Sequence, residues 1–378
     1  MKKIINKLKS YKLSNLNFRL IVYVLGITLL GIFTIGSAVD GGNFQNKQIV
    51  GLGIGIIFLI ITTLVSYKFI FKFYWLIYLF ANVLLIIVLL FGTTNKGATR
   101  WIDLGFTEFQ PSEICKIFFV IFVVTYLYKR REKISSFRTI IGVSLFAMFQ
   151  VLLIYREPDL STTIVFFITF CAIMFLSGIH YKIVTAVLVI AVPVIIVFGY
   201  LVIQPDSGIL EDYQYNRIVG FYQKDNPEAE KIRYQQENSL LAIGSGGLSG
   251  KGLDNNTVTS VKNGNFLSES HTDFIFTIVG EELGFIGCSA VILLMFLIVL
   301  ECFITGSRTN ELHGKLYCFG FGIIIAIQTF INISVATMML PNTGLTLPFV
   351  SYGLTSLISL YIGVGIVLNI GLQRKRLI

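Results

Sequence analysis

The chain has 378 residues, of which 54% are hydrophobic and only 13% are charged, and it contains 33 phenylalanines. With a mean hydropathy of +0.77, this composition excludes an ordinary soluble domain and predicts an all-α, polytopic membrane protein. The formal net charge of +9 does not indicate a nucleic-acid partner. The basic residues flank apolar segments, where they set topology and attract anionic membrane lipids.

About ten apolar segments are long enough to cross a bilayer. They cover residues 20–38, 48–66, 72–92, 112–128, 139–155, 160–178, 182–203, 272–303, 316–340 and 349–371. Lysines and arginines recur in alternate loops, so both termini, including the basic tail 1–19, are expected in the cytoplasm. No cleavable signal peptide is expected, because this tail leads into a full-length span. We therefore predict a single membrane domain over residues 1–378.

The five cysteines, an odd number, lie in or beside these apolar segments and lack metal-ligand spacing. We interpret them as small core residues and predict no metal site from them.

The polar segment 92–116 separates the third and fourth spans on the outer side. Glu113 and Lys116 are three residues apart at the start of a span, so they can pair on one helix face. Such a structural ion pair would keep two charges from facing lipid. Trp101 suits either an interfacial anchor or a side chain that flanks a sugar.

Two shorter outer segments carry helix-breaking residues. In the segment 155–163, YREPDLSTT, Pro158 and the adjacent Asp159 suit a helix start, so the simplest role for Asp159 is to cap that helix. In 340–356, LPNTGLTLPFVSYGLTS, prolines and Gly344 interrupt the helix close to the membrane surface. Irregular backbone at that depth is tolerated only where it is buried or lines a cavity.

The long segment 204–270 precedes the eighth span and carries nine acidic and six basic residues. This balance agrees with an extracellular location. A connection of this length is usually functional or folded upon itself. Its glycine cluster at 242–253 lacks the spacing of a P-loop or a dinucleotide-binding turn, so a phosphate-binding role is not favoured.

Asp273 is the best candidate for a catalytic residue, and it lies at the junction between this segment and the eighth span. If a helix begins near Ser270, Asp273 heads a stripe of small residues that is typical of contacts between membrane helices. The stripe comprises Thr277, Gly280, Gly284 and Gly287. Alternatively, Ser270 or Thr272 caps the helix and Asp273 only favours its positive end.

Polar groups are thus expected at the outer leaflet in four separate segments, and no comparable set is expected on the cytoplasmic side. The groups are Arg100 and Lys116, Arg156 and Asp159, Arg217 and Lys251, and Asp273. Bases that could hold an anionic head group, near a carboxylate that could remove a proton, indicate a lipid-phosphate substrate. Sequence spacing alone does not establish that these groups converge.

Five segments of the chain resemble the signature segments of the SEDS family (shape, elongation, division and sporulation), which includes RodA and FtsW. They are GATRWIDLGFTEFQPSEICK, EPDLSTT, QENSLLAIGSGGLSGKGL, ESHTDFIFTIVGEELGFIG and LPNTGLTLPFVSYGLTS. The resemblance extends over nearly the whole chain in the family's order. GSGG followed by GKG, with the short basic tail, is more similar to RodA than to FtsW.

The resemblance implies a peptidoglycan glycosyltransferase of the bacterial cytoplasmic membrane. Such enzymes polymerise lipid II, an undecaprenyl-pyrophosphate-linked disaccharide-peptide, at the outer face and work with a crosslinking class B penicillin-binding protein. Matching the family's motifs implies that Asp273 is the essential acid, here taken as a general base for an inverting transfer. It also implies a set of substrate-binding residues: Arg100, Trp101, Lys116, Asp159, Arg217 and Lys251.

The same resemblance leaves some points open. Basic side chains or a divalent cation, Mg²⁺ or Mn²⁺, could offset the charge of the pyrophosphate, and no cofactor is firmly expected. EPDLSTT, SESHTDF and SYGL stand where QPDLGT, PExHTDF and SYGG are usual, which affects loop geometry. The alternative functions are a lipid II flippase, and a non-catalytic scaffold of the cell-wall synthesis complex.

Overall fold

The computed structural model describes residues 15–39, 42–95, 98–103, 105, 108–183, 185, 215, 217–218, 221, 227–254, 267 and 269–373. The expected span 182–203 and much of the long outer segment lie outside these residues.

Within that part, eight helices are long and apolar enough to cross a membrane, and α8 (Leu160–Leu176) is a shorter apolar helix. The eight are α2 (Phe18–Ala38), α3 (Asn43–Leu64), α5 (Tyr74–Phe91), α6 (Pro111–Lys129), α7 (Phe137–Arg156), α12 (Ile275–Ser307), α13 (Leu312–Ala336) and α14 (Leu354–Leu372). These nine helices match nine of the ten expected spans. The prediction of an all-α polytopic membrane protein is confirmed.

Several helix starts follow from local sequence. Asn17 begins α2 by accepting a hydrogen bond from the Leu20 amide at 3.2 Å. Ser136 does the same for α7 at 3.3 Å. Pro111 occupies the first turn of α6, where its missing N–H has no cost. Such caps satisfy amides that would otherwise be left without partners at a helix end.

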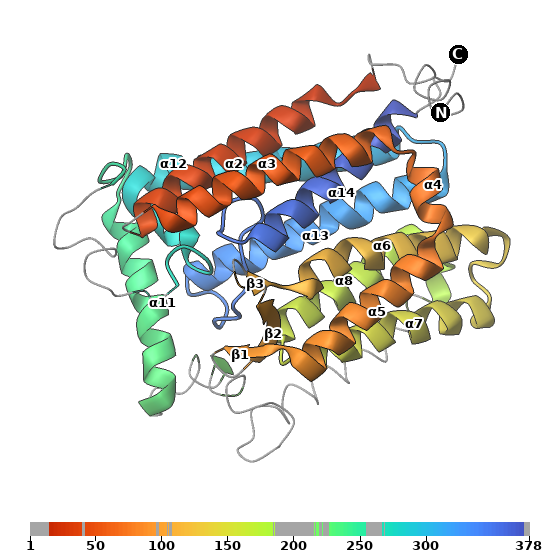
Figure 1. The fold of residues 1–378 in the computed structure, drawn as a ribbon, viewed down its shortest axis with the longest axis horizontal. Helices are drawn as coiled ribbons and strands as arrows, with labels where there is room; N and C mark the ends of the chain where they lie inside the picture. Colours follow the sequence, from red (N-terminus) through yellow and green to blue (C-terminus); the bar gives the residue numbers. More distant parts are fainter. Residues whose placement is uncertain are drawn as a thin grey trace.

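The spanning helices lie side by side along the long axis of the molecule (Figure 1). The main neighbours are α3 with α14, α12 with both α2 and α13, and α5 with α6. Helix α6 is buried along most of its length, whereas α3 and α5 expose apolar residues on their outer faces. In a membrane protein those exposed faces meet lipid. Short elements join the bundle at one end, namely α4 (Tyr67–Lys72) and η2 (Arg131–Lys133).

A small antiparallel sheet stands at the other end of the bundle, between α5 and α6. It consists of β1 (Thr93–Asn95), β2 (Ala98–Asp103) and β3 (Glu108–Phe109), in the order β1-β2-β3. Ile102 lies opposite Phe109, and Asp103 lies opposite Glu108. The sequence did not predict this sheet, which holds Arg100 and Trp101 in a strand rather than a loop.

Part of the long segment 204–270 forms helix α11 (Pro227–Ser245), which crosses one end of the bundle at a steep angle (Figure 1). The turn after it packs against α12. Ser239 of α11 is hydrogen-bonded to Thr277 of α12, and Gly280 lies against Ile243. The expected small-residue face therefore contacts a helix, although that helix comes from the outer segment.

Helix α12 is interrupted at Gly284, whose φ of 65° and ψ of −158° are not helical. Four backbone hydrogen bonds from the turn after α11 replace the lost helical ones. Lys251 and Gly252 amides donate to the carbonyls of residues 281 and 282, each at 3.0 Å. Carbonyls 247 and 248 accept from the amides of residues 285 and 286, at 2.9 and 3.2 Å. The segment 246–252 thus completes a spanning helix.

We expect Gly246→Ala to destabilise this junction, because a Cβ at that position would collide with the Gly280 carbonyl oxygen. Overpacking against backbone costs about 1–3 kcal/mol, which would lower the melting temperature of the purified protein. Gly244→Ala is the matched control, since nothing lies within 4 Å of a Cβ there and alanine favours the helix. Equal melting temperatures for the two variants would contradict the packing shown.

Polar side chains also gather at the end of the bundle where α2 begins and α14 ends. Glu311 accepts hydrogen bonds from Lys68 and from the Tyr67 hydroxyl, the latter at 3.3 Å. Asn17 donates to Glu301 at 2.9 Å. The expectation that only the outer side carries such a set was wrong. The residues of this cluster come from four helices or their caps, so no local sequence pattern predicts the cluster.

Candidate functional site

Asp273 lies in a tight turn that precedes α12. The Thr272 and Phe274 amides both donate to the Glu269 carbonyl, at 3.3 and 3.1 Å, and the Thr272 hydroxyl donates to the Glu269 carboxylate at 2.9 Å. Helix α12 begins only at Ile275, so the expected start near Ser270 was wrong. Asp273 therefore does not lie within the helix, and the turn presents its partly exposed carboxylate to a cavity.

Two other elements fix this turn. The side-chain amide of Asn332, on α13, donates to the backbone carbonyls of Asp273 and Leu345, at 2.8 and 2.7 Å. From the segment 337–353, the Ser351 hydroxyl donates to the Thr272 carbonyl at 2.6 Å. The turn is thereby attached to α13 and to the irregular segment that precedes α14. The position of Asp273 depends on contacts made far away in sequence.

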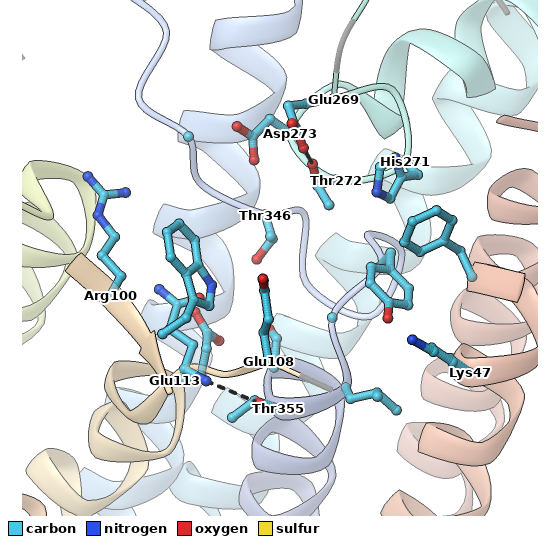
Figure 2. A pocket seen from close by; sticks show the side chains of 18 of the residues that line it. Lys47, Arg100, Glu108, Glu113, Glu269, His271, Thr272, Asp273, Thr346 and Thr355 are labelled. Atoms are coloured by element: carbon cyan, nitrogen blue, oxygen red, sulfur yellow. Dashed lines mark hydrogen bonds between the residues drawn. The ribbon is translucent and has the colours of Figure 1, made fainter. Parts of the chain in front are cut away.

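The turn forms one wall of a polar cavity of about 630 Å³, here called the outer cavity. Figure 2 shows Asp273 above its centre, Arg100 on one side and Lys47 on the other. The charged side chains that line the outer cavity are Lys47, Arg100, Asp103, Glu108, Glu113, Arg217, Glu269 and Asp273. Its walls come from α3, β2, β3, the start of α6 and the start of α14.

Arg217 and Asp273 meet at Gly344. A Cβ built on Gly344 would lie 2.7 Å from Arg217 Nη1 and 3.4 Å from Asp273 Oδ2. Gly344 has a φ of +72°, a conformation that L side chains rarely adopt. A glycine is therefore required here twice, for the backbone conformation and for the space between guanidinium and carboxylate.

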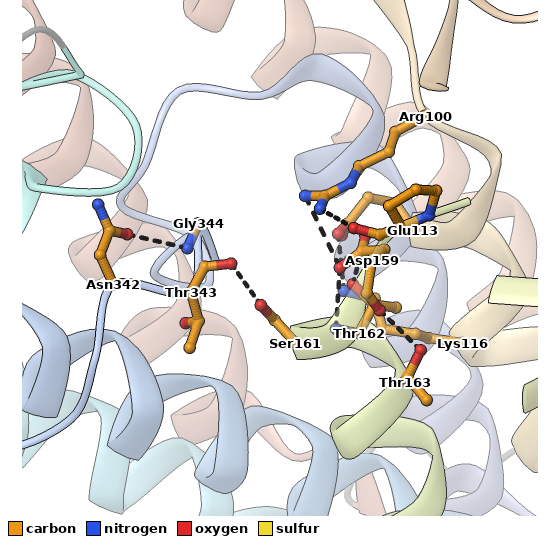
Figure 3. Close-up of polar contacts among 11 residues, drawn as sticks. Arg100, Glu113, Lys116, Asp159, Ser161, Thr162, Thr163, Asn342, Thr343 and Gly344 are labelled. Carbon is orange, nitrogen blue, oxygen red and sulfur yellow. Dashed lines mark hydrogen bonds and ion pairs between the residues drawn. The ribbon is translucent and has the colours of Figure 1, made fainter. Parts of the chain in front are cut away.

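Arg100 is buried at the boundary of the outer cavity, beside the start of α8. Its guanidinium donates to the Pro158 carbonyl and lies 3.8 Å from Asp159 Oδ1. Asp159 also caps α8, accepting from the amide and hydroxyl of Thr162 at 3.1 and 2.9 Å. Figure 3 shows this cluster on one side and the segment 342–344 on the other. The capping role of Asp159 and an ion pair with Arg100 thus coexist.

The two lysines expected to bind substrate are both paired with glutamates. Lys116 forms an ion pair with Glu113 at 2.8 Å, and both side chains are buried. Lys251 forms an ion pair with Glu281 at 2.7 Å. Neither lysine lines the outer cavity, although Glu113 does, and Asp159 reaches it only through Arg100. Of the expected substrate-binding residues, Arg100, Trp101 and Arg217 line it.

A second hollow, here called the apolar groove, runs between α8 and α13 and has a volume of about 650 Å³. Leu160, Ile164 and Ile168 form one side, and Ile327, Phe330 and Ile331 form the other. Arg100 and Arg217 line both the groove and the outer cavity. The two hollows therefore meet at a pair of cations.

Sequence reasoning missed several residues of the outer cavity, above all Lys47, Phe44 and Tyr352. Burial, and then the negative charge of Glu108, raise the pKa of the Tyr352 phenol, so it remains a neutral hydroxyl. Lys47 is the fifth residue of α3. A lysine just before an apolar segment is usually interpreted as a residue that sets the orientation of the helix in the membrane. Only the packing of α3 against α14 reveals that it faces the site.

Glu157 is an unusual acid beside the Arg100 cluster. It follows the last residue of α7, it is fully buried, and among the described residues neither carboxylate oxygen has a hydrogen-bond partner. Burial raises its pKa to about 9; the negative charge of Asp159 also raises it, whereas Arg100 lowers it. Glu157 is therefore protonated at neutral pH, and it occupies the position where the resemblance led us to expect glutamine.

We expect Glu157→Gln to stabilise the protein increasingly as the pH rises. The folded pKa lies above the unfolded value of 4.5, so the stability that protonated Glu157 contributes is complete below pH 4.5 and is lost towards pH 9. Glutamine does not titrate, and its advantage should reach about 1–3 kcal/mol near pH 8. Melting temperatures between pH 5 and 8.5 test this.

The exposed Glu132 provides the control for that series. Glu132→Gln should shift the melting temperature by a similar small amount at every pH. A pH-independent difference between Glu157→Gln and the natural protein would contradict the assignment of a buried, protonated acid.

The donor set for a divalent cation is incomplete. Glu108, Glu269 and Asp273 all line the outer cavity. Yet no three His, Cys, Asp or Glu side chains of the described chain lie close enough together to hold a metal ion. Mg²⁺ and Mn²⁺ need several oxygen ligands directed at one point. The expectation of Mg²⁺ or Mn²⁺ therefore stays a prediction.

A polar cavity that joins an apolar groove at two arginines, within a bundle of spanning helices, defines a membrane protein suited to a molecule with a charged head and an apolar tail. A family model described as "Cell cycle protein", covering FtsW, RodA and SpoVE, matches residues 14–376. The chain belongs to this family, as its motifs led us to expect.

Individual relatives carry both branch names. The chain is 36% identical over 305 residues to "Probable peptidoglycan glycosyltransferase FtsW" of Buchnera aphidicola subsp. Schizaphis graminum, covering 79% of this chain and 82% of the relative. It is 35% identical over 305 residues to "Peptidoglycan glycosyltransferase MrdB" of Escherichia coli K12, covering 80% and 78%. These similar identities leave the RodA-like assignment a prediction.

Solved structures share the fold. One is a chain of a structure described as "Structural coordination of polymerization and crosslinking by a peptidoglycan synthase complex", with a TM-score of 0.78 and 25% identity over 95% of this chain and 98% of that chain. Another is the rod shape determining protein RodA of Thermus thermophilus, with a TM-score of 0.70 and 25% identity, covering 96% and 98%.

Proposed function

We propose that this chain is a peptidoglycan glycosyltransferase that polymerises lipid II at the outer face of the cytoplasmic membrane. One observation carries the proposal: Asp273 and Arg217 meet at Gly344, where the polar outer cavity joins the apolar groove. The relatives' names support the same reaction class. Substrates of this class combine a polyprenyl chain, a pyrophosphate and sugars, which suit the groove, the arginines and the cavity in turn.

The proposed step is an inverting transfer. Asp273 takes the proton of the acceptor's 4-hydroxyl as the oxygen attacks the anomeric carbon of the donor. The bond between that carbon and the pyrophosphate oxygen breaks, and polyprenyl pyrophosphate leaves with the electron pair. A positioned base contributes roughly 10²- to 10⁴-fold in rate. The turn around Asp273, hydrogen-bonded to Asn332 and Ser351, provides that positioning.

The arginines offset the negative charge of the leaving pyrophosphate, which is the second requirement of the reaction. Arg217 lies beside Asp273, and Arg100 is buried with its guanidinium directed by Pro158 and Asp159. Guanidinium groups bind phosphate oxygens in a bidentate manner. Because both arginines also line the apolar groove, a donor pyrophosphate can bind there with its prenyl chain between α8 and α13.

Topology and partner follow as parts of the same proposal. Alternation of basic loops supports cytoplasmic termini, and α2 begins beside the end of α12, since Asn17 binds Glu301. A crosslinking class B penicillin-binding protein is the proposed partner. The similar chain in a synthase complex for polymerization and crosslinking supports this assignment.

The test is reconstitution in liposomes with lipid II, with and without the proposed partner. Glycan strands and released undecaprenyl pyrophosphate are expected from the natural protein and not from a mock preparation. Movement of lipid II between leaflets without strand formation would instead establish the flippase function. If a preparation that binds the partner neither forms strands nor moves lipid II, the scaffold function is established instead.

A further inference from the structure

Polymerisation brings two lipid-linked molecules into one site, and each carries its own pyrophosphate. The donor's pyrophosphate is bonded to the reacting carbon and must lie next to the base. The acceptor's pyrophosphate is retained, and it lies a disaccharide away from the attacking hydroxyl. A site of this kind therefore needs two anion-binding positions at different distances from Asp273.

The arginines fit only the nearer position. Arg217 shares the space around Gly344 with Asp273, and Arg100 and Arg217 border the apolar groove. A pyrophosphate held there is adjacent to the base, as the donor requires. The acceptor's pyrophosphate needs a cation elsewhere in the outer cavity.

Lys47 is a further cation of the outer cavity. It lines the outer cavity from α3, on the side opposite to Arg100, with Asp273 between them (Figure 2). Lys116 and Lys251 are neutralised by glutamates at 2.8 and 2.7 Å. Lys47, by contrast, forms no ion pair with any carboxylate in the described part of the chain. Within the described residues, the charge of Lys47 is therefore not neutralised by an ion pair.

Aromatic rings line the cavity wall beside Lys47. The Phe44 ring lies 4.4 Å from the His271 ring and 4.9 Å from that of Tyr352, and all three residues line the outer cavity. The three rings offer a flat apolar surface for the C–H faces of a sugar, and the His271 imidazole and the Tyr352 hydroxyl can hydrogen-bond its hydroxyls. His271 is two residues from Asp273, so a disaccharide on this wall runs from Lys47 towards the base.

The outer face of α3 gives a lipid-linked molecule access to Lys47. Ile49 and Val50, which follow closely on α3, are 49% and 59% exposed, and in a spanning helix these side chains meet lipid. Lys47 itself is only partly exposed. It therefore stands at the border between the membrane and the cavity, away from the groove between α8 and α13.

We propose that Lys47 binds the pyrophosphate of the acceptor lipid II, so that donor and acceptor phosphates are held at opposite sides of the outer cavity with Asp273 between them. This inference rests on the proposed function and adds the acceptor's binding position to it. A lysine that merely extends its charge to the membrane interface would have no preference among acceptors.

The experiment separates acceptor from donor with synthetic substrates. The donor is a labelled lipid II whose terminal sugar is the 4-epimer, used because its inverted hydroxyl makes it a poor acceptor. Two unlabelled acceptors are compared: lipid II itself, and the same prenyl-linked disaccharide-peptide with a neutral linker in place of the pyrophosphate. The measured quantity is the rate of label transfer to each acceptor by the reconstituted protein.

The natural protein should prefer the pyrophosphate-bearing acceptor by roughly 10- to 100-fold, as expected for a charge-assisted contact. Lys47→Gln should abolish the preference by slowing transfer to lipid II, with transfer to the neutral acceptor unchanged. Lys47→Arg should retain it. The control is Lys72→Gln on the exposed face of α4, which should behave as the natural protein.

Each other outcome overturns the inference in a distinguishable way. If Lys47→Gln slows transfer to both acceptors equally, Lys47 acts on the donor or on the fold; a melting temperature tells these apart. If it changes neither rate, Lys47 binds no substrate. If the natural protein transfers label to neither acceptor while Lys72→Gln is equally inactive, the proposed function itself fails.

Discussion

Asp273→Asn should slow strand formation from lipid II by roughly 10²- to 10⁴-fold. The substitution removes the base while keeping the size of the side chain. The fold should survive, because Asn332 binds the Asp273 backbone carbonyl and not its side chain. Rates measured with purified lipid II, together with melting temperatures, check both parts of this prediction.

Asp254→Asn is the matched control for that experiment. Asp254 also belongs to the outer segment, and its φ of 57° is a conformation that asparagine accepts readily. It should retain activity. Near-normal polymerisation by Asp273→Asn would assign the chemistry to another residue of the outer cavity, with Glu108 and Glu269 the first to examine.

Gly344→Ala should have the second-largest effect on activity. The added methyl group would lie 2.7 Å from Arg217 Nη1 and 3.4 Å from Asp273 Oδ2, so the guanidinium must move away from the base. Displacements of this size at a reacting centre cost on the order of 10²-fold in rate. The measurement is the rate of polymerisation at saturating lipid II.

Backbone strain at Gly344 must be separated from this effect. Gly178→Ala provides the comparison, because Gly178 has a φ of +86° and nothing within 4 Å of an added Cβ. Both variants should lose about 1 kcal/mol of stability, but only Gly344→Ala should lose activity. Equal activities would contradict the proposed approach of Arg217 to Asp273.

The spanning helices could be predicted because each depends on its own apolar length. The sheet could not, because strands such as Thr93–Asn95 and Glu108–Phe109 are too short to show alternation. The start of α12 was misplaced for a different reason. The turn at 269–274 is held by Asn332 and Ser351, which are distant in sequence.

Some residues of the candidate site could likewise be predicted from sequence motifs, whereas others depend on the tertiary structure. Asp273, Arg100, Trp101 and Arg217 were singled out from motifs, and they line one cavity. The ion pair between Lys251 and Glu281 joins residues thirty positions apart, so charge type alone suggested a ligand-binding lysine. Lys47 was missed because its importance depends on which side of α3 faces the cavity.

The break in α12 has a consequence for the order in which the protein assembles. Without the turn 246–252, the backbone groups of α12 near Gly284 would lose their hydrogen-bond partners, and each such group would cost several kcal/mol if it were removed from water. The turn 246–252 provides those partners. With the topology proposed above, we expect this turn to be translocated and to dock before α12 reaches its final position, so that its translocation limits the rate of assembly.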